Sequence, residues 1–474
     1  MKAFTSREEI DLFNNKKVAV IGAGISNRPL ISFLAKAGAH CTVFDKRELS
    51  EFIEFREQCR AKAYDIAWST GENYLEQLHG FDMIFRSPAV RPDLPEIREE
   101  AKRGATLSSE MEVFFALCPC DIIAITGSDG KTTTTTLIHR LLEAAGIRTH
   151  LGGNIGRPLL ADIHQIKKQD IAVVELSSFQ LLTMTQSPQT AVMTNISPNH
   201  LDIHKDYQEY KSAKANILRH QNIFDRLVLN GNCNELSDYA LEAKAPVFWT
   251  ERRPFGDRPL FGIEGNEIFF QKSAEEAKKI LMYREDLLMP GRYNALNVLS
   301  ALAAVADRVD IYDPALLQVL KDFKGVEHRT EFIRELNGVK YYNSSIDSSP
   351  QRSLNSLSAF KERAIPVVMI AGGKDKKCDY QGLGRQIVSS CKAVYLVGQN
   401  SALIRAQIEE ESNREELDKL VIQECHDYQE AVHLAKNIAV DGDAVLLSPA
   451  GTSFDAFNNF MERGEFFKKL VKQL

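Results

Sequence analysis

Residues 121–136, DIIAITGSDGKTTTTT, combine an apolar run, a glycine-containing turn and a lysine followed by hydroxyl side chains. The apolar run predicts a strand, and the spacing of LIHRLLEAAG just after it predicts a helix. A glycine turn between a strand and a helix start directs backbone N–H groups and the positive end of the helix dipole to one point. Lys131 adds a full positive charge there, and the Thr132 hydroxyl is suited to Mg²⁺. The segment therefore predicts a site for the terminal phosphates of a nucleotide.

The glycine pattern of this segment departs from the strict phosphate-loop motif. That motif requires a glycine five residues before Gly130, where this chain has Ile125. A glycine turn ahead of an ordinary helix is the alternative interpretation, but the order Gly-Lys-Thr seldom arises by accident. We interpret the segment as a shortened phosphate loop.

Further polar side chains follow strand-like runs downstream. Glu175 ends the run IAVVE, Asn154 lies in the turn GGNIG, and His200 follows the run TAVMTNIS. Ligands of open α/β sheets bind at the carboxyl ends of strands. A carboxylate and an imidazole at neighbouring ends could hold a divalent cation bound to phosphate oxygens. The alternatives are a carboxylate near a helix start for Glu175 and a packed histidine for His200.

Lys214 lies on the apolar face of a helix that we predict over residues 206–220. Helical spacing places it with Tyr207, Tyr210, Ile217 and Leu218. A buried amine loses its proton readily, which makes it a nucleophile toward carbon dioxide or a partner for phosphate. The alternative is a side chain that extends along the apolar face to reach solvent.

A second glycine turn lies near the N-terminus. Residues 22–24 (GAG) follow a strand-like run, and Asp45 ends the next one, as in dinucleotide-binding folds, but Asn27 occupies the position of the third glycine. Three interpretations stay open. They are a nicotinamide-dependent oxidoreductase, a turn without a ligand, and a diphosphate site at residues 24–26 with residues 45–47 at the base or ribose.

Strand-like and helix-like segments alternate through the whole chain, which predicts an α/β fold. A chain of 474 residues is too long for one core, so we divide it at residues 1–119, 120–325 and 326–474. The first and third domains are expected to be Rossmann-like, and the second to be a P-loop ATPase-like α/β domain. Strands are expected near 17–21, 39–45, 81–90, 171–177, 190–197, 226–232, 339–343, 366–371, 393–397 and 443–448. A long amphipathic helix is expected at the C-terminus.

The composition, with 44% hydrophobic and 26% charged residues, is that of a soluble globular protein. The apolar runs are too short for a transmembrane helix, and the N-terminal segment carries charges where a signal peptide needs an apolar stretch. Eight cysteines without a Cys-x-x-Cys pair fit a reducing cytoplasm. The net charge of −6 argues against nucleic acid as a partner, so local cations and N–H groups must hold any anionic substrate.

Segments along almost the whole chain resemble those of the Mur ligases of peptidoglycan synthesis. In the first domain they are IGAGIS and FDKR, and in the second AITGSDGKTT, GGNIG, ELSSFQL, NISPNHLD, YKSAK and GRYNALN. In the third they are GVEHRTEF, YYNSSIDSSP, AGGKDK and LLSPAGTSFDAFNNFMERG. The phosphate-loop and ELSSFQL segments are shared with related amide ligases, whereas the last segment resembles the glutamate-adding member.

The resemblance implies roles for individual positions. The UDP-linked substrate would contact Ile25, Ser26, Asp45, Lys46, Arg47 and Asn154. ATP would contact Gly127, Ser128, Asp129, Gly130, Lys131, Thr132, Thr133, Asn294, Asn297 and Arg329. The incoming amino acid would contact Ser348, Lys376, Ser453 and Phe460. Two Mg²⁺ ions would be held by Thr132, Glu175 and His200, with a carbamylated Lys214 as a further anionic ligand, and Lys131, Glu175, His200 and Lys214 would form the catalytic group.

The implied reaction adds D-glutamate to UDP-N-acetylmuramoyl-L-alanine at the expense of ATP. A carboxylate is a poor electrophile, so phosphoryl transfer must first convert it into an acyl phosphate, which the amine of glutamate then attacks. Lys376 and the loop SPAGTS, leading into a helix expected over 454–460, would bind the two carboxylates of glutamate. A simple helix N-cap is the alternative role of Ser453. The enzyme is expected to be a monomer without membrane insertion.

Five positions differ from the pattern of the family: Ala89, Asp129, Ser344, Ile346 and Gly451. None of these differences removes a phosphate-binding or metal-binding group, so we expect an active enzyme. The alternatives are another Mur-type or folylpolyglutamate-type amide ligase and, in a different class, an NAD-dependent oxidoreductase.

Overall fold

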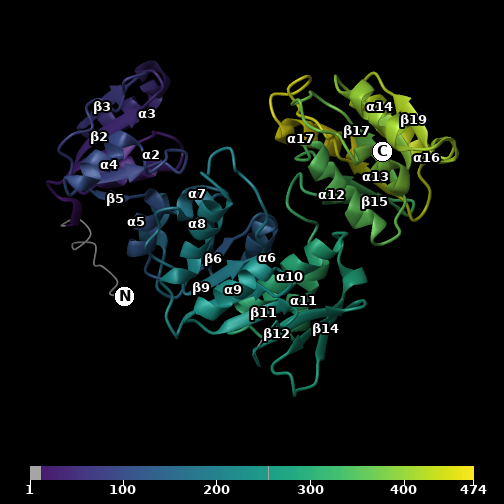
Figure 1. The fold of residues 1–474 in the computed structure, drawn as a ribbon, viewed down its shortest axis with the longest axis horizontal. Coiled ribbons are helices and arrows are strands. Elements are labelled where there is room, and N and C mark those ends of the chain that lie inside the picture. The colour runs from purple at the N-terminus through teal and green to yellow at the C-terminus, as the bar shows by residue number, and fades with distance from the viewer. Residues whose placement is uncertain (1–11, 255) are drawn as a thin grey trace. The chain divides into compact units, whose positions relative to one another are not determined.

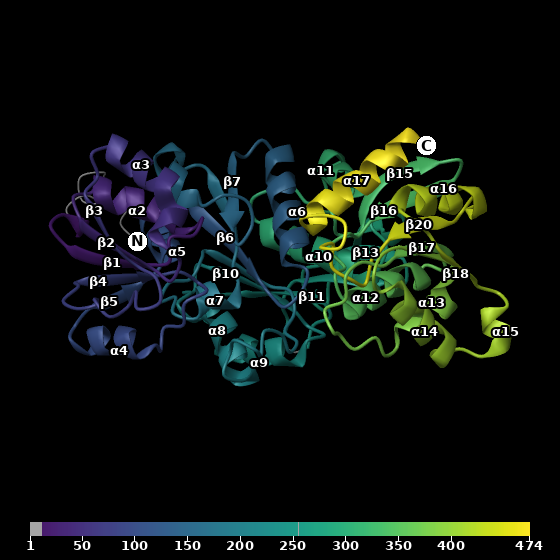
Figure 2. The same cartoon turned by 90° about the horizontal axis from the view of Figure 1, so that it is seen from above.

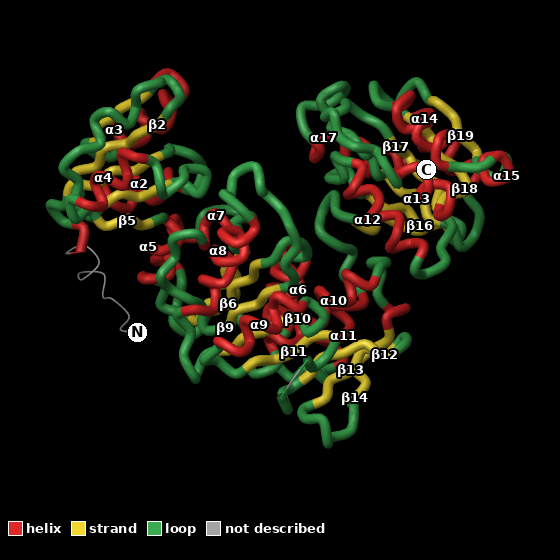
Figure 3. Tube along the Cα trace, in the orientation of Figure 1, coloured by secondary structure: helices red, strands yellow, loops and turns green. Residues whose placement is uncertain are grey.

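The computed structural model describes residues 12–254 and 256–474. Within these residues three sheets flanked by helices lie in successive parts of the chain, over 17–108, 121–283 and 331–447 (Figures 1 and 3). The chain up to Leu281 and the segment Asn297–Leu316 form one compact unit, and Met282–Leu296 with Leu317–Leu474 form a second. The α/β fold with three domains is confirmed.

The N-terminal domain is a parallel sheet in the order β3-β2-β1-β4-β5. Its strands are β1 (Lys17–Ile21), β2 (His40–Asp45), β3 (Ile66–Thr70), β4 (Met83–Arg86) and β5 (Thr106–Ser108). Its helices are α2 (Asn27–Lys36), η1 (Leu49–Phe52), α3 (Ile53–Ala61), α4 (Pro95–Lys102) and α5 (Glu110–Leu117). The strand order reverses between β1 and β4, and ligands of open α/β sheets bind at such a reversal.

The middle domain is a larger sheet in the order β14-β13-β12-β11-β10-β9-β6-β8-β7. Strands β6, β7, β10 and β11 of this sheet are labelled in Figure 2. Its strands are β6 (Asp121–Thr126), β7 (Thr149–Gly153), β8 (Ile171–Glu175), β9 (Thr190–Met193), β10 (Arg226–Asn230), β11 (Val247–Glu251), β12 (Leu260–Glu264), β13 (Glu267–Gln271) and β14 (Lys279–Tyr283). Its helices are α6 (Lys131–Ala144), η2 (Leu159–Gln165), α7 (Ser178–Leu181), α8 (Tyr207–Arg219) and α9 (Asn234–Glu242). Of the elements that follow, η3 (Arg284–Asp286) belongs to the second compact unit, and α10 (Arg292–Val305) and α11 (Pro314–Lys321) are divided between the two units. Because β6 pairs in parallel with both β8 and β9, the loops after these three strands emerge at one edge.

The C-terminal domain has the strand order β15-β16-β20-β17-β18-β19, with only the β15–β16 pair antiparallel among the described pairs. Its strands are β15 (Glu331–Leu336), β16 (Val339–Asn343), β17 (Val367–Ala371), β18 (Cys391–Leu396), β19 (Val421–Glu424) and β20 (Ala444–Leu447). Its helices are α12 (Pro350–Lys361), α13 (Leu383–Ser390), α14 (Ser401–Glu411), α15 (Arg414–Leu417), α16 (Tyr428–Ile438) and α17 (Phe460–Gln473).

The prediction of a helix over residues 454–460 is wrong. The N–H groups of Ala456 and Phe457 donate to the carbonyl of Ser453 in an isolated turn, and α17 begins only at Phe460. Asn459 is its N-cap, because the Asn459 side chain accepts a hydrogen bond from the N–H of Glu462. Asparagine competes with helical hydrogen bonds from inside a helix and favours the cap position, so the two asparagines before Phe460 delay the helix start. Ser453 is therefore not the N-cap of α17.

Among residues 12–254 and 256–474, none of the helices has the length and apolar character that crossing a bilayer requires. The C-terminal helix is amphipathic as expected, since Phe467 and Val471 are buried while its opposite side carries charged residues.

Candidate active site

The turn between β6 and α6 has the backbone that a phosphate loop needs. Gly130, the N-cap of α6, is in the left-handed region with φ 78°, and a side chain there would overlap the Asn297 amide. A side chain at Gly127 would overlap the Thr194 hydroxyl. Both positions therefore require glycine. Because Gly130 offers no side-chain cap, the first-turn N–H groups of α6 have no side-chain acceptor at the N-cap.

Two lysines converge on this turn. Lys131 Nζ donates to the carbonyl oxygens of Gly127 at 3.0 Å and Ser128 at 2.9 Å. Lys214 Nζ donates to the same Gly127 oxygen at 2.8 Å and to Thr126 Oγ1 at 3.3 Å. The Gly127 carbonyl thus accepts hydrogen bonds from both lysine side chains.

Lys214 lies in the interior, as the helical spacing predicted. Its side chain is only 2% exposed, with Tyr210 and Ile217 buried beside it on α8, so the alternative of a side chain that reaches solvent is excluded. Burial, and then the positive charge of Lys131, lower the pKa of Lys214 well below its usual range. The neutral amine is therefore favoured at this position.

Glu175 is the last residue of β8, and its two carboxylate oxygens differ in their hydrogen bonding. Its Oε1 accepts a hydrogen bond of 2.8 Å from Asn154 Nδ2. Its Oε2 is buried, in a residue that is 1% exposed, and has no hydrogen-bond partner among residues 12–254 and 256–474. A buried carboxylate oxygen without a donor is costly, and a bound cation would remove that cost. The donor set of Glu175 and the Thr132 hydroxyl, both oxygen ligands, fits Mg²⁺.

The neighbouring histidine does not pack in the core. His200 is exposed at φ 55°, and its ring meets the edge of Phe179, in α7, at a centroid distance of 5.2 Å. The interpretation of His200 as a packed histidine is therefore wrong. The described residues contain no group of three or more His, Cys, Asp or Glu side chains that could hold a metal ion.

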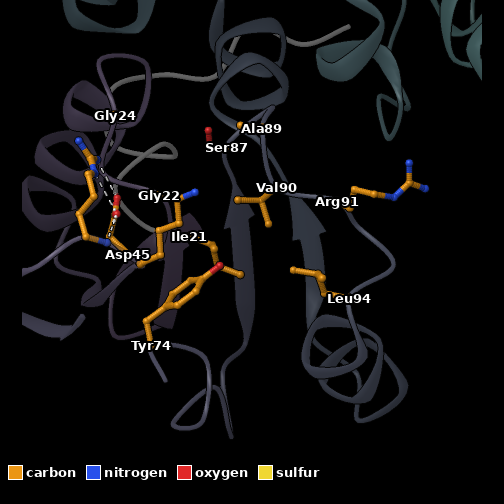
Figure 4. A pocket seen from close by; sticks show the side chains of 12 residues that line it. Ile21, Gly22, Gly24, Asp45, Tyr74, Ser87, Ala89, Val90, Arg91 and Leu94 are labelled. Carbon is orange, nitrogen blue, oxygen red and sulfur yellow. Dashed lines mark hydrogen bonds and ion pairs between the residues drawn. The ribbon is translucent and has the colours of Figure 1, made fainter. Parts of the chain in front are cut away.

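A cavity of about 420 Å³ opens at the carboxyl ends of β1, β2 and β4, where the strand order reverses. Figure 4 shows Asp45, Tyr74, Val90 and Leu94 around this hollow. Its lining residues are Ile21, Gly22, Gly24, Asp45, Lys46, Arg47, Tyr74, Ser87, Ala89, Val90, Arg91 and Leu94. The turn 22–24 and the segment 45–47 thus meet at one cavity.

The Asp45 carboxylate accepts hydrogen bonds from two residues beside this cavity. Its Oδ2 accepts from the Ala23 N–H at 2.7 Å, and Arg47 donates to both carboxylate oxygens, at 3.0 Å and 2.9 Å. Burial would raise the pKa of Asp45, but the hydrogen bonds from Arg47 and Ala23 outweigh it and lower that pKa. Asp45 is therefore an anion that fixes the glycine turn and the Arg47 guanidinium, while Lys46 is exposed beside them.

Other predicted residues of this region are not among those that line the cavity. Ile25 is 78% exposed, and Ser26 begins α2 without a side-chain hydrogen bond to the helix. Asn27 Nδ2, in place of the third glycine, donates to the Gly22 carbonyl at 2.8 Å and so braces the turn. Tyr74 and the lining residues Ser87, Val90, Arg91 and Leu94 were not predicted, and the strand expected over 81–90 was the only signal for those after β4.

In the C-terminal domain, two loops that were predicted to hold the amino acid are paired. Lys374 and Thr452 exchange backbone hydrogen bonds of 2.8 Å and 2.9 Å. This pairing brings the segments that carry Lys376 and Ser453 side by side. Asn400, which the sequence analysis missed, fastens both loops, because its Oδ1 accepts from the Gly373 N–H at 2.7 Å and its Nδ2 donates to the Ala450 carbonyl at 3.3 Å.

The remaining predicted residues fall in both compact units. Asn297 lies against the phosphate loop, and its Oδ1 accepts from Thr134 Oγ1 at 3.3 Å. In the other unit, Asn294 Nδ2 donates to the Pro290 carbonyl at 2.7 Å, and the Arg329 N–H donates to Val326. Ser345, in the loop that carries Ser348, donates to the Phe460 carbonyl at 2.7 Å.

Comparison with known proteins agrees with this organisation. Three family models match in succession: the Mur ligase MurD-like N-terminal domain over 16–109, the Mur ligase middle domain over 125–305, and the Mur ligase glutamate ligase domain over 328–451.

Among similar proteins, the UDP-N-acetylmuramoylalanine–D-glutamate ligase of Acetivibrio thermocellus is 47% identical over 97% of this chain and 97% of its own length. The ligase of the same name from Ruminiclostridium cellulolyticum is 44% identical over 97% of both chains.

Two solved structures from Thermotoga maritima share the fold, each with a TM-score of 0.55. The UDP-N-acetylmuramate–alanine ligase is 18% identical and covers 97% of this chain and 100% of its own. The MurF ligase in complex with ADP is 16% identical and covers 98% of this chain and 97% of its own.

The three matched models span most of the sequence, and the two curated relatives are similar to it over nearly its full length. The chain belongs to the Mur ligase family.

Proposed function

We propose that this protein is the ligase that adds D-glutamate to UDP-N-acetylmuramoyl-L-alanine with consumption of ATP. The observation that carries the proposal is the 47% identity, over 97% of both chains, to a relative named for this reaction. The cavity of the N-terminal domain and the phosphate loop of the middle domain agree with a nucleotide-linked substrate and ATP. An NAD-dependent oxidoreductase would leave the phosphate loop and its two lysines without a role.

Each of the three domains that we predict from the sequence binds one substrate. The domains are 1–119 for the UDP-linked substrate, 120–325 for ATP and 326–474 for the amino acid. The protein acts as a cytoplasmic monomer on small-molecule substrates, without nucleic acid or membrane insertion.

The middle domain binds and activates the phosphates of ATP. The start of α6 presents N–H groups to the γ-phosphate, and Lys131 neutralises charge on its oxygens as the phosphoryl group moves to the substrate carboxylate. Glu175 and Thr132 would hold one Mg²⁺ and His200 a second. The metal supplies charge neutralisation of the phosphate oxygens. The product of this half of the reaction is an acyl phosphate, whose carbonyl carbon is a good electrophile.

Lys214 contributes an additional negative charge after carbamylation. Its neutral amine forms an N–C bond to carbon dioxide and releases a proton, which leaves an anionic carbamate. Burial and the charge of Lys131, which lower the pKa of Lys214, support this step because only the unprotonated amine reacts.

The C-terminal domain orients D-glutamate for attack. Lys376 and the loop that contains Ser453 bind its carboxylates, with Ser348 and Phe460 beside them. The free amine of D-glutamate attacks the acyl carbon, the tetrahedral intermediate collapses, and inorganic phosphate leaves.

The proposal is tested with purified protein, UDP-N-acetylmuramoyl-L-alanine, ATP, Mg²⁺ and a panel of amino acids that includes both enantiomers of glutamate. We expect phosphate release and a new amide, detected by mass spectrometry, with D-glutamate alone. Lys131→Ala is the control, because it should abolish turnover without unfolding the protein. Preferential use of another amino acid, such as L-alanine or a diamino acid, would contradict the proposal.

A further inference from the structure

Arg463, in α17, is a buried cation without an acidic partner. The residue is 1% exposed. Its Nε donates to Ser345 Oγ at 3.1 Å, and its Nη2 donates to the carbonyl oxygens of Ser345 at 2.9 Å and Gly451 at 3.1 Å. Its Nη1 is buried and takes part in none of these hydrogen bonds, and among the described residues the Tyr428 hydroxyl is a further polar neighbour of the guanidinium. Within the described parts of the chain, no carboxylate oxygen lies within 4.0 Å of its nitrogens.

The next buried cation of α17 shows the usual arrangement. Lys468 forms ion pairs with Glu465 at 2.8 Å, Glu327 at 3.0 Å and Glu331 at 3.1 Å. A buried charge without a counter-ion is unfavourable, and proteins ordinarily pair such charges. Arg463 departs from this rule although acidic residues are available on its own helix. The missing negative charge is therefore expected to come from elsewhere.

The place of Arg463 indicates where that charge binds. Its hydrogen bonds join the loop after β16, at Ser345, to the loop after β20, at Gly451. Its Nη1 lies 3.0 Å from the point that a Cβ on Gly373, in the loop after β17, would occupy. These three loops carry Ser348, Ser453 and Lys376. The guanidinium thus lies beneath the site proposed for an amino acid with two carboxylates.

We propose that Arg463 is a positioning residue for the dicarboxylate amino acid. It holds the loops after β16 and β20 together from below, and its uncompensated positive charge stabilises the bound carboxylates across the loop backbone. Coulomb attraction through the protein interior is less screened than in water, so the guanidinium acts without touching the ligand. The inference rests on the proposed function, since it takes D-glutamate as the ligand.

The test compares Arg463→Gln, which removes the charge, and Arg463→Lys, which keeps it, with Lys468→Gln as a matched control on the same helix. Steady-state KM values for D-glutamate, ATP and the UDP-linked substrate are measured for each protein, and folding is checked by circular dichroism and thermal unfolding. We expect Arg463→Gln to raise the KM of D-glutamate roughly tenfold or more, as loss of a weakly screened charge should. The KM of ATP should stay within about twofold, and Arg463→Lys should restore most of the affinity for D-glutamate. Lys468→Gln should lower the melting temperature without changing any KM.

The results separate the inference from a purely structural role. An unchanged KM of D-glutamate in a folded Arg463→Gln protein would overturn the inference, and so would an equal rise in Lys468→Gln. If Arg463→Gln does not fold, Arg463→Lys decides: a KM close to that of the wild type supports the role of the charge, and a tenfold rise overturns it. Wild-type protein that forms no amide would instead refute the proposed function.

Discussion

Replacement of Lys214 by methionine tests the central feature of the active site, because it should change stability and activity in different ways. The substitution removes hydrogen bonds to Gly127 and Thr126, which costs about 1 kcal/mol each. Methionine fills a similar volume, and exchange of a buried amine that must lose its proton for an apolar group contributes about 1–4 kcal/mol in the opposite direction. The free energy of unfolding should therefore change by between about −1 and +2 kcal/mol.

Activity should fall much further than stability. If Lys214 carries an anionic carbamate beside the phosphate loop, its loss should reduce kcat by roughly 10²–10³-fold, the usual effect of removing one electrostatic group from a transition state. Added bicarbonate should increase the activity of dialysed wild type and leave the variant unchanged. Phosphate release measures both effects. Lys211→Met, on the same helix with its ammonium over the Tyr207 ring, is the control and should remain active.

The stability of the two proteins should also differ in its dependence on pH. Burial, and then the charge of Lys131, lower the folded-state pKa of Lys214, so the unfolded chain binds more protons at this residue. Below the lowered pKa of Lys214, burial of its charge reduces the free energy of unfolding by the full amount. This reduction becomes smaller as pH rises from the lowered pKa toward the unfolded value of about 10.4. The stability of the methionine variant relative to wild type should therefore be greatest at low pH and decline as pH rises, which urea unfolding at several pH values measures. A fully active Lys214→Met enzyme, or a stability difference independent of pH, would refute the reasoning.

Three more substitutions test the other parts of the site. Glu175→Gln should lower activity roughly 10²-fold and raise the Mg²⁺ concentration needed for half-maximal rate, because it removes the negative charge around the unpartnered Oε2; an unchanged Mg²⁺ titration would argue against a cation there. Asp45→Asn should raise the KM of the UDP-linked substrate roughly tenfold, since Ala23 and Arg47 lose their anionic acceptor. The KM of ATP should stay unchanged, and equal effects on both KM values would contradict this prediction. Gly130→Ala should lower the free energy of unfolding by at least about 1–2 kcal/mol, the cost of a left-handed conformation, and should weaken ATP binding. Calorimetry measures both effects, and wild-type stability and affinity would show that the turn tolerates a side chain.

Local patterns were the part of the architecture that could be predicted. The helix expected over 206–220 is α8 (Tyr207–Arg219), and the strand expected near 339–343 is β16. Both rest on the spacing of apolar residues, which depends on neighbours in the sequence. The helix expected over 454–460 failed because two asparagines favour a cap over a helix interior.

Contacts between distant segments could not be predicted in this way. Strands β12 and β13 pair as an antiparallel hairpin over residues 260–271, where no strand was expected from the sequence. The pairing of Glu175 with Asn154 depends on β7 lying beside β8, and the chain offers no local signal for that order.

The sequence alone determined the phosphate loop and the buried face of Lys214, because glycine spacing and helical periodicity are properties of short segments. Only the tertiary structure decided that Lys131 and Lys214 share the Gly127 carbonyl, that Asp45 is turned inward to Ala23, and that Arg463 joins the loops of Ser345 and Gly451. The physical reason is that these contacts depend on the order of strands in a sheet. That order is set by the packing of the whole domain and not by the residues next to each group in the chain.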